Sequence, residues 1–291
     1  MSDIALVGAF SSGARMAWRG MRSIDYALVS SLHRFIPHAD EAQLRAEEKR
    51  TLAEARQWGL GSSSSGWSSD LQLLADLQHF GTSTRLLDVT SNPMTALWFA
   101  AQQLSDEERR TGFDDDGVLL AINVAEWPRF GRTPPTSLLA GARPLSWELT
   151  EALASRRPFV VDAHYPNDRL RAQEGFFISA TLPEQDPRTP FRSIPLELPH
   201  TTGSLATMAL AHVQGALDRD ELPPRFQEKG LLAIPFMAFH VRASAKQRIL
   251  DILKNSYNRS ASVLFPDFAG FREFAESARP RTSPQETDAK R

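Results

Sequence analysis

The order of helical and strand patterns along the chain restricts its fold more than any other feature. A strand pattern that ends at Gly20 is followed by helical patterns at residues 39–60 and 71–80, and strand patterns return at residues 117–124 and 174–180. Because strands and helices do not alternate in strict succession, a doubly wound parallel sheet is not expected. The pattern predicts a single mixed α+β domain, with small antiparallel or mixed sheets flanked by helices.

Short polar signals predict where the helices begin. Asp40 is expected to cap the first long helix and Asp70 the second, while Asn92 followed by Pro93 is typical of a helix start. The Gly/Ser-rich stretch at residues 61–69 is expected to be a polar surface loop. These signals divide the first hundred residues into three helices.

Composition excludes several classes of function. The 291 residues include 33 Lys and Arg against 35 Asp and Glu, for a net charge of −2, which gives no general attraction to nucleic acid or to an anionic membrane. Cysteine is absent, so disulfides, Cys-ligated zinc and thiol catalysis are excluded. The first residues do not follow a signal-peptide pattern, and no apolar run approaches the roughly 18 residues that a membrane span needs. A cytoplasmic protein without a membrane partner is expected.

The common sequence signatures of catalysis are missing. There is no G-x-x-x-x-G-K-[ST] loop, no G-x-G-x-x-G after a strand, no H-E-x-x-H and no G-x-S-x-G elbow. No metal site is expected, because the seven histidines do not recur at helical spacing. Three polar features remain: an arginine at a strand end, the T-S-T-R-L-L-D turn and the N-D-R-L-R-A-Q-E-G-F-F cluster.

These features, in this order, resemble the FRG domain family, which is named for a Phe-Arg-Gly motif. Trp18-Arg19-Gly20 stands at the position of that motif. The stretches L-A-D-L-Q-H-F-G-T-S-T-R-L-L-D-V-T-S-N-P-M-T-A-L-W-F-A (74–100) and N-D-R-L-R-A-Q-E-G-F-F-I-S (167–179) are similar to two further blocks, and residues 244–270 to the closing helix and F-P-D turn. The resemblance implies an FRG domain over residues 1–279, with its motifs in residues 15–275. The polar tail, residues 280–291, is expected to be disordered. FRG proteins occur in bacteria and phages in settings that suggest toxins or phage defence, so a toxin or defence effector is expected.

The block order also resembles that of ADP-ribosyltransferases, which implies NAD as substrate and an ADP-ribosyltransferase-like fold. In those enzymes an arginine grips NAD, a Ser/Thr turn orients the nicotinamide ribose, and a carboxylate or amide faces the reacting carbon. Carried onto this chain, the expected NAD-binding residues are Arg19, Gly20, Thr82, Ser83, Thr84, Arg85, Asp88 and Arg169. The expected catalytic residues are Gln173, Glu174 and His79. The acceptor would be a protein or nucleic acid, and a neutralising antitoxin or regulatory partner is a further expectation.

Several of these residues have a structural alternative. Arg85 and Asp88 can pair across one tight turn instead of contacting a substrate. His79 is either a satisfied, half-buried histidine or a neutral base. The amide of Gln173 either finds partners in the fold or binds a ligand, and an amide cannot serve as an anion. The chain is therefore either an NAD-consuming enzyme or a non-catalytic nucleotide-binding or protein-interaction module.

Overall fold

The computed structural model describes Ile4 and residues 15–132, 144–155, 157–164, 166–182 and 236–276. The described residues form one seven-stranded sheet, in the order β6-β7-β8-β4-β1-β5-β9, and a two-stranded hairpin. The strands are β1 (Met16–Met21), β2 (Ser62–Ser63), β3 (Gly66–Trp67), β4 (Leu87–Thr90), β5 (Gly117–Asn123), β6 (Arg129–Phe130), β7 (Phe159–Val161), β8 (Gly175–Ser179) and β9 (Phe236–Val241). All neighbours in the large sheet are antiparallel except β6 and β7.

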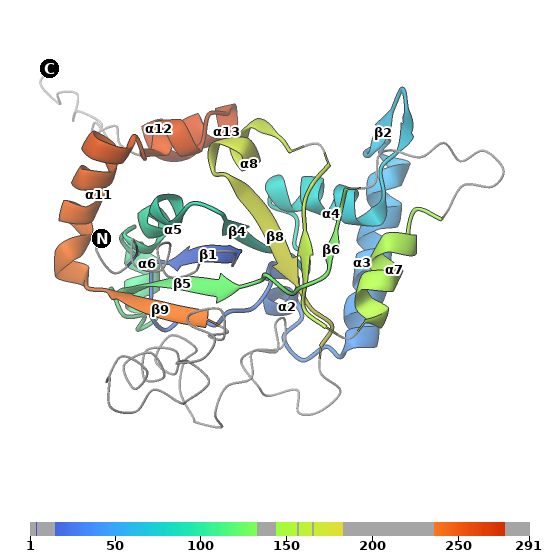
Figure 1. The fold of residues 1–291 in the computed structure, drawn as a ribbon, viewed down its shortest axis with the longest axis horizontal. Helices are drawn as coiled ribbons and strands as arrows, with labels where there is room; N and C mark the ends of the chain where they lie inside the picture. The colour runs from blue at the N-terminus through green and yellow to red at the C-terminus, as the bar shows by residue number, and fades with distance from the viewer. Residues whose placement is uncertain are drawn as a thin grey trace, which may run out of the picture.

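The helices gather in two groups. Figure 1 shows α3, α4 and α7 beside β6 and β7, and α5 and α11 near β1, β5 and β9. The helical segments are α2 (Ser31–Phe35), α3 (Glu41–Gln57), α4 (Asp70–His79), α5 (Pro93–Ala100), α6 (Asp106–Arg110), α7 (Trp147–Ala154), α8 (Asp168–Ala172), α11 (Ala243–Tyr257), α12 (Ala261–Leu264), α13 (Phe268–Gly270) and the π-helical η2 (Phe271–Glu276).

Local capping signals explain most of the helix starts. Asp40 caps α3 in a capping box with Gln43, and Asn92 caps α5 with proline at its first position, as predicted. The prediction for Asp70 was wrong: Ser69 caps α4 by accepting from Gln72 N, and Asp70 is the first helical residue. The stretch expected as a loop at residues 61–69 contains the β2–β3 hairpin.

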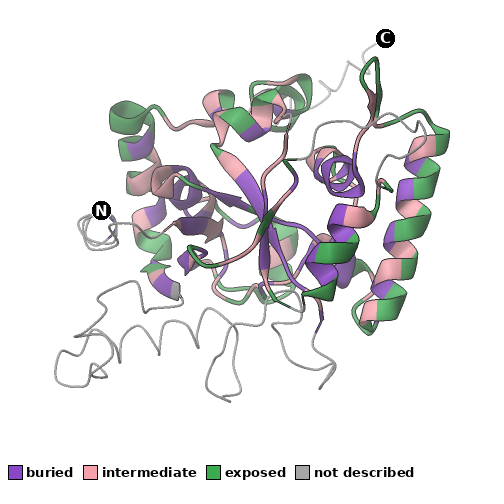
Figure 2. Ribbon diagram, turned by 45° about the vertical axis from the view of Figure 1, so that its right-hand side comes forward, coloured by how far each residue is buried: buried purple, intermediate pink, exposed green. Residues whose placement is uncertain are grey.

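The core of the described residues has two large parts, which meet at β8, and a small third part around Leu32 and Leu44. One large part surrounds β1, β5 and α5 and includes Trp18 and Leu120, while the other joins α4 to β7 and includes Leu74 and Phe159. Figure 2 shows the central strands buried and the outer faces of α3 and α7 exposed. Burying this apolar surface is the main force that stabilises these parts.

The ladder between β1 and β4 has the fewest residue pairs in the sheet. Their ladder has one residue pair, Trp18 with Thr90, whereas β1 and β5 are registered at six pairs. α5 packs directly against β1 at Gly20, where a Cβ atom would lie 1.8 Å from the Ala96 carbonyl oxygen. Glycine is therefore required here by packing. This arrangement places α5 beside the weakly paired strands.

The predicted α+β class, with a mixed sheet flanked by helices, is confirmed, although one large sheet stands where small sheets were expected. Within the described residues, no helix combines the length and apolar character that crossing a bilayer requires. The tail expected to be disordered, residues 280–291, lies outside the described residues.

Candidate functional site

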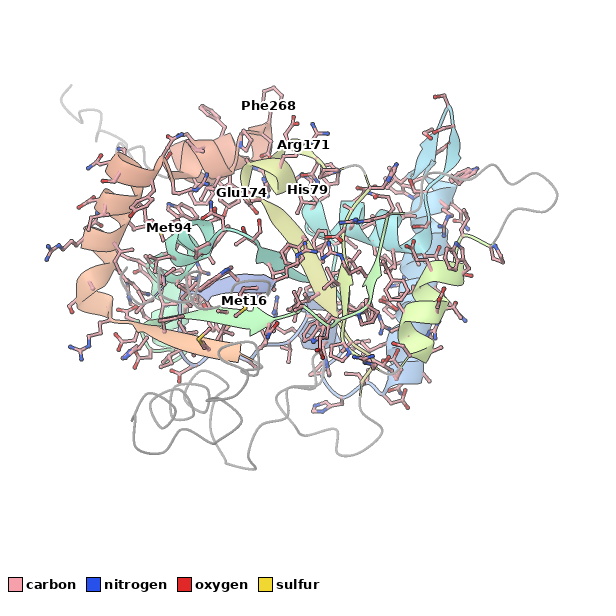
Figure 3. The ribbon with its side chains drawn as sticks, in the orientation of Figure 1. Met16, His79, Met94, Arg171, Glu174 and Phe268 are labelled. Carbon is pink, nitrogen blue, oxygen red and sulfur yellow. The ribbon has the colours of Figure 1, made fainter. Side chains whose placement is uncertain are left out.

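A cavity of about 350 Å³ lies where β1 meets β4, between α4, α5 and α8. This volume is within the range of small-molecule sites, roughly 300–1,000 Å³. Figure 3 shows His79, at the end of α4, on the same side of the sheet as α8. The functional polar groups that line the cavity are Arg19, Gln78, His79, Asp88, Arg169 and Gln173.

Arg19 is the cavity's incompletely paired cation. Its Nη1 donates to the backbone oxygen of Asp88 at 2.5 Å, and this bond spans the gap between β1 and β4. Its Nε is buried and has no hydrogen-bond acceptor among the described residues. Burial lowers the pKa of the guanidinium, and the charge of Asp88 partly opposes that shift. A buried donor without an acceptor is costly, but Arg15, Arg56 and Arg259 each have one such nitrogen too, so what distinguishes Arg19 is its place in the cavity lining.

Thr95, another residue of the cavity lining, has an unpaired polar atom. Thr95, in α5, is fully buried, and its Oγ1 has no hydrogen-bond partner among the described residues. Sequence reasoning missed this residue. The available signal was a hydroxyl in an otherwise apolar helix, where threonine can also bond a backbone carbonyl of the preceding turn.

Asp88 and Gln78 form a hydrogen-bonded pair at the cavity wall. Gln78 Nε2 donates to Asp88 Oδ2 at 2.8 Å, and Thr84 Oγ1 donates to Gln78 Oε1 at 2.8 Å. The Thr84 hydroxyl also accepts from Leu86 N, and its side chain is fully buried. Gln78 was not among the expected site residues, although its position next to His79 in α4 could have suggested it.

His79 lines the cavity with a half-buried imidazole. Its pKa is lowered mainly by burial and then by the positive charge of Arg169, while Asp267 and Asp88 act in the opposite direction. The ring packs edge-on against Phe80, with 4.8 Å between centroids. A histidine with a lowered pKa is neutral near pH 7 and can accept a proton.

Arg169 contributes a cation that is already neutralised. Its Nε and Nη2 donate to the two carboxylate oxygens of Asp267 at 2.9 and 2.8 Å. The guanidinium also lies over the ring of Phe265, 4.8 Å from its centroid. These contacts connect α8 to the segment around α12 and α13, which covers one side of the cavity.

The structure separates the two adjacent candidates at residues 173 and 174. Gln173 lines the cavity, and its Nε2 donates to the Leu264 backbone oxygen at 3.0 Å. Glu174 has a left-handed backbone, with φ of 51°, and its side chain does not line the cavity. Its Oε1 accepts from Asn92 Nδ2 at 2.8 Å and from Arg259 Nη2 at 2.6 Å. The two residues therefore have different surroundings.

The expected pair between Arg85 and Asp88 is absent. Arg85 donates from Nε and Nη2 to the two oxygens of Glu48, at 2.6 and 2.7 Å, and from Nη1 to Glu41 at 3.0 Å. The prediction failed because Glu48 and Glu41, from α3, supply the partners of Arg85, while Asp88 lies within β4 and accepts from Gln78. Burial alone would lower the pKa of Arg85, but the charges of Glu48 and Glu41 outweigh it and raise that pKa. Arg85 does not line the cavity.

The Ser/Thr turn also lies apart from the cavity lining. Thr82 and Ser83 are half-buried and Thr84 is fully buried, but none of the three lines the cavity, which Gly81 borders instead. The structure thus brings together Arg19, Gly20, His79, Asp88, Arg169 and Gln173 from the expected set. It leaves Thr82, Ser83, Thr84, Arg85 and Glu174 outside the lining. No group of three His, Asp or Glu side chains in the described ranges is arranged as a metal site.

Comparison with known families identifies an FRG domain in the first part of the chain. The family model of the FRG domain matches residues 14–109, which include Trp18-Arg19-Gly20 and the T-R-L-L-D block. Neither the comparison with curated proteins nor that with solved structures gave a match. The FRG prediction is therefore confirmed over the matched residues, and the relation to ADP-ribosyltransferases stays a prediction.

Proposed function

We propose that the cavity binds NAD and that the protein transfers ADP-ribose from NAD to a macromolecule. The observation that carries this proposal is the half-buried Arg19 side chain, which makes one hydrogen bond to the described residues, in a cavity that it shares with His79, Asp88 and Gln173. The other N–H groups of its guanidinium can donate to a phosphate or ribose oxygen.

The walls of the cavity also suit a nucleotide. Trp18, Phe99 and Phe265 supply aromatic surface against which a planar base or nicotinamide ring can pack. Arg19 supplies the planar fork that matches phosphate oxygens. Arg169 needs its Asp267 partner to move before it can bind phosphate, so Arg19 is the first anchor in this account.

The reaction needs a group that accepts a proton as the acceptor attacks. His79 fits this role because its lowered pKa keeps the imidazole neutral near pH 7. Gln173 lines the cavity, and the resemblance to ADP-ribosyltransferases implies that its side chain hydrogen-bonds a ribose hydroxyl. A role as a toxin or anti-phage effector, with a protein or nucleic acid as acceptor and a neutralising partner, follows from the settings in which FRG domains occur.

One observation favours a second candidate, a nucleotide-binding module without turnover. Gln173 is an amide whose nitrogen is engaged by the Leu264 carbonyl, and Glu174 is engaged by Arg259. If the carboxylate needed for catalysis must come from this pair, the protein binds NAD but does not cleave it.

Incubating the purified protein with NAD labelled in the adenylate part distinguishes the two candidates. The enzyme proposal predicts nicotinamide release and label on macromolecules of a bacterial lysate, with both lost in Arg19→Met. Arg109→Met, at an exposed surface ion pair, is the matched control and keeps wild-type rates. Thermal stabilisation by NAD without nicotinamide release supports the binding module. Neither stabilisation nor release contradicts both.

A further inference from the structure

The cavity contains one carboxylate among the residues that the structure describes, and it belongs to Asp88. The other nearby carboxylates are already engaged. Glu174 is paired with Arg259 and lies outside the lining. Asp267 is held by both nitrogens of the Arg169 fork. Asp88 is therefore the carboxylate that a ligand in the cavity would meet.

A directed hydrogen-bond relay orients this carboxylate. Leu86 N donates to Thr84 Oγ1, so the Thr84 hydroxyl directs its own hydrogen to Gln78 Oε1. Ser31 Oγ lies 3.3 Å from the same amide oxygen and 3.2 Å from the Thr84 backbone oxygen, and its single hydrogen can go to either. Because the amide oxygen accepts from this side, the amide nitrogen must face Asp88, which it does at 2.8 Å. The relay holds Asp88 as an acceptor.

The relay reaches only one of the two oxygens of the Asp88 carboxylate. Oδ2 accepts from Gln78, while Oδ1 receives no hydrogen bond from the described residues. Arg19, the nearest cation on the cavity wall, donates to the backbone oxygen of Asp88 and makes no ion pair with its side chain. The cavity is thus lined by a guanidinium with one hydrogen bond to protein and by an exposed carboxylate with one oxygen free of described partners. This pattern suits a ligand with a negative group at one point and a developing positive charge at another.

We propose that Asp88 is the catalytic carboxylate of this site, with Gln78 as its positioning residue; the assignment rests on the proposed function. The bond between ribose C1′ and nicotinamide nitrogen breaks, and its electron pair leaves with neutral nicotinamide. Asp88 Oδ1 stabilises the positive charge that develops on C1′ and the ring oxygen. The acceptor hydroxyl oxygen then forms a bond to C1′, and its proton passes to the neutral imidazole of His79. Asp88 takes the role that the sequence had suggested for Gln173 or Glu174.

Asp88→Asn and Glu174→Gln form a matched pair that tests this assignment. Both remove one negative charge with little change of shape, and asparagine at position 88 still offers an oxygen to the Gln78 amide. Nicotinamide release from NAD gives the rate, and calorimetric binding of ADP-ribose gives affinity without turnover. Asp88→Asn is expected to lower the rate by about 100-fold or more while it retains ADP-ribose binding, and Glu174→Gln to keep both near wild type. Gln78→Leu is expected to lower kcat more than it raises KM, because its main effect is to misdirect the carboxylate.

The outcomes separate this inference from the proposed function. If the wild-type protein releases no nicotinamide, both are overturned. If the wild type is active and Asp88→Asn remains active, only the Asp88 assignment is overturned. Loss of activity in Glu174→Gln with Asp88→Asn active transfers the role to Glu174. If Asp88→Asn loses ADP-ribose binding together with its rate, Asp88 is a binding residue and its catalytic assignment is overturned.

Discussion

Arg85, just before β4, is buried, whereas Arg19, in the neighbouring β1, is half-buried, and their partners differ. Arg85 is 3% exposed, its fork is matched by the two oxygens of Glu48, and its remaining nitrogen reaches Glu41. Arg19 makes one hydrogen bond to a backbone oxygen, and its Nε is buried without an acceptor among the described residues. Every nitrogen of the Arg85 guanidinium thus has an acceptor, whereas Arg19 Nε has none in the described ranges.

This difference distinguishes an arginine that stabilises the fold from one that can bind a ligand. A buried cation whose donors are all satisfied anchors the fold, because removing one partner leaves the other charge unpaired in the interior. A half-buried cation with unused donors keeps N–H groups that a ligand oxygen can take. The same sequence neighbourhood, the T-R-L-L-D turn, thus contains a structural arginine at residue 85 and a cavity carboxylate at residue 88.

The largest expected effect is a loss of stability when Arg85, the arginine with a full set of partners, is replaced. Arg85→Met leaves Glu48, 2% exposed, and the half-buried Glu41 without their partner, so the free energy of unfolding should fall by about 3–5 kcal/mol. The control Arg109→Met removes a surface ion pair and should cost about 1 kcal/mol or less. Urea denaturation measures both. Equal costs for the two variants would show that the Arg85 cluster does not anchor the fold.

A smaller effect on stability is expected when pH changes the protonation of His79, which lines the cavity. The pKa of His79 is lower in the folded protein than its ordinary value, so the unfolded chain binds more protons below about pH 6.5. Stability should therefore fall as pH decreases through that value, and His79→Gln should remove this part of the loss. The measurement is unfolding free energy at about pH 7.5 and pH 5.5 for both proteins. A parallel loss in wild type and variant would contradict a lowered pKa for His79.

Local signals in the sequence predicted much of the fold. The cap at Asp40, the Asn92-Pro93 start and the strand that ends near Gly20 depend on a few neighbouring residues, and each is present. The cap at Asp70 failed because Ser69, one position earlier, offers an equally good acceptor. The single large sheet was missed because strand pairing joins segments that are far apart in sequence, and no local pattern specifies it.

The residues of the site were predictable only where a sequence motif contained them. Arg19, Asp88 and Gln173 were named from motifs, and the fold brings them to one cavity. Thr84 was expected to line the ribose, but its hydroxyl orients Gln78 from within the protein. Glu48, the partner of Arg85, lies 37 positions away in the chain, so the turn itself gave no indication of the pair.

The most direct test of the account is the affinity for ADP-ribose of wild type and Arg19→Met, measured by calorimetry. Arg19→Met removes one hydrogen bond to a backbone oxygen and a half-buried cation, so its free energy of unfolding should change by about 1 kcal/mol or less. The account predicts binding by the wild type and its loss in this equally stable variant. Equal affinity in the two proteins, or no binding by either, would contradict it.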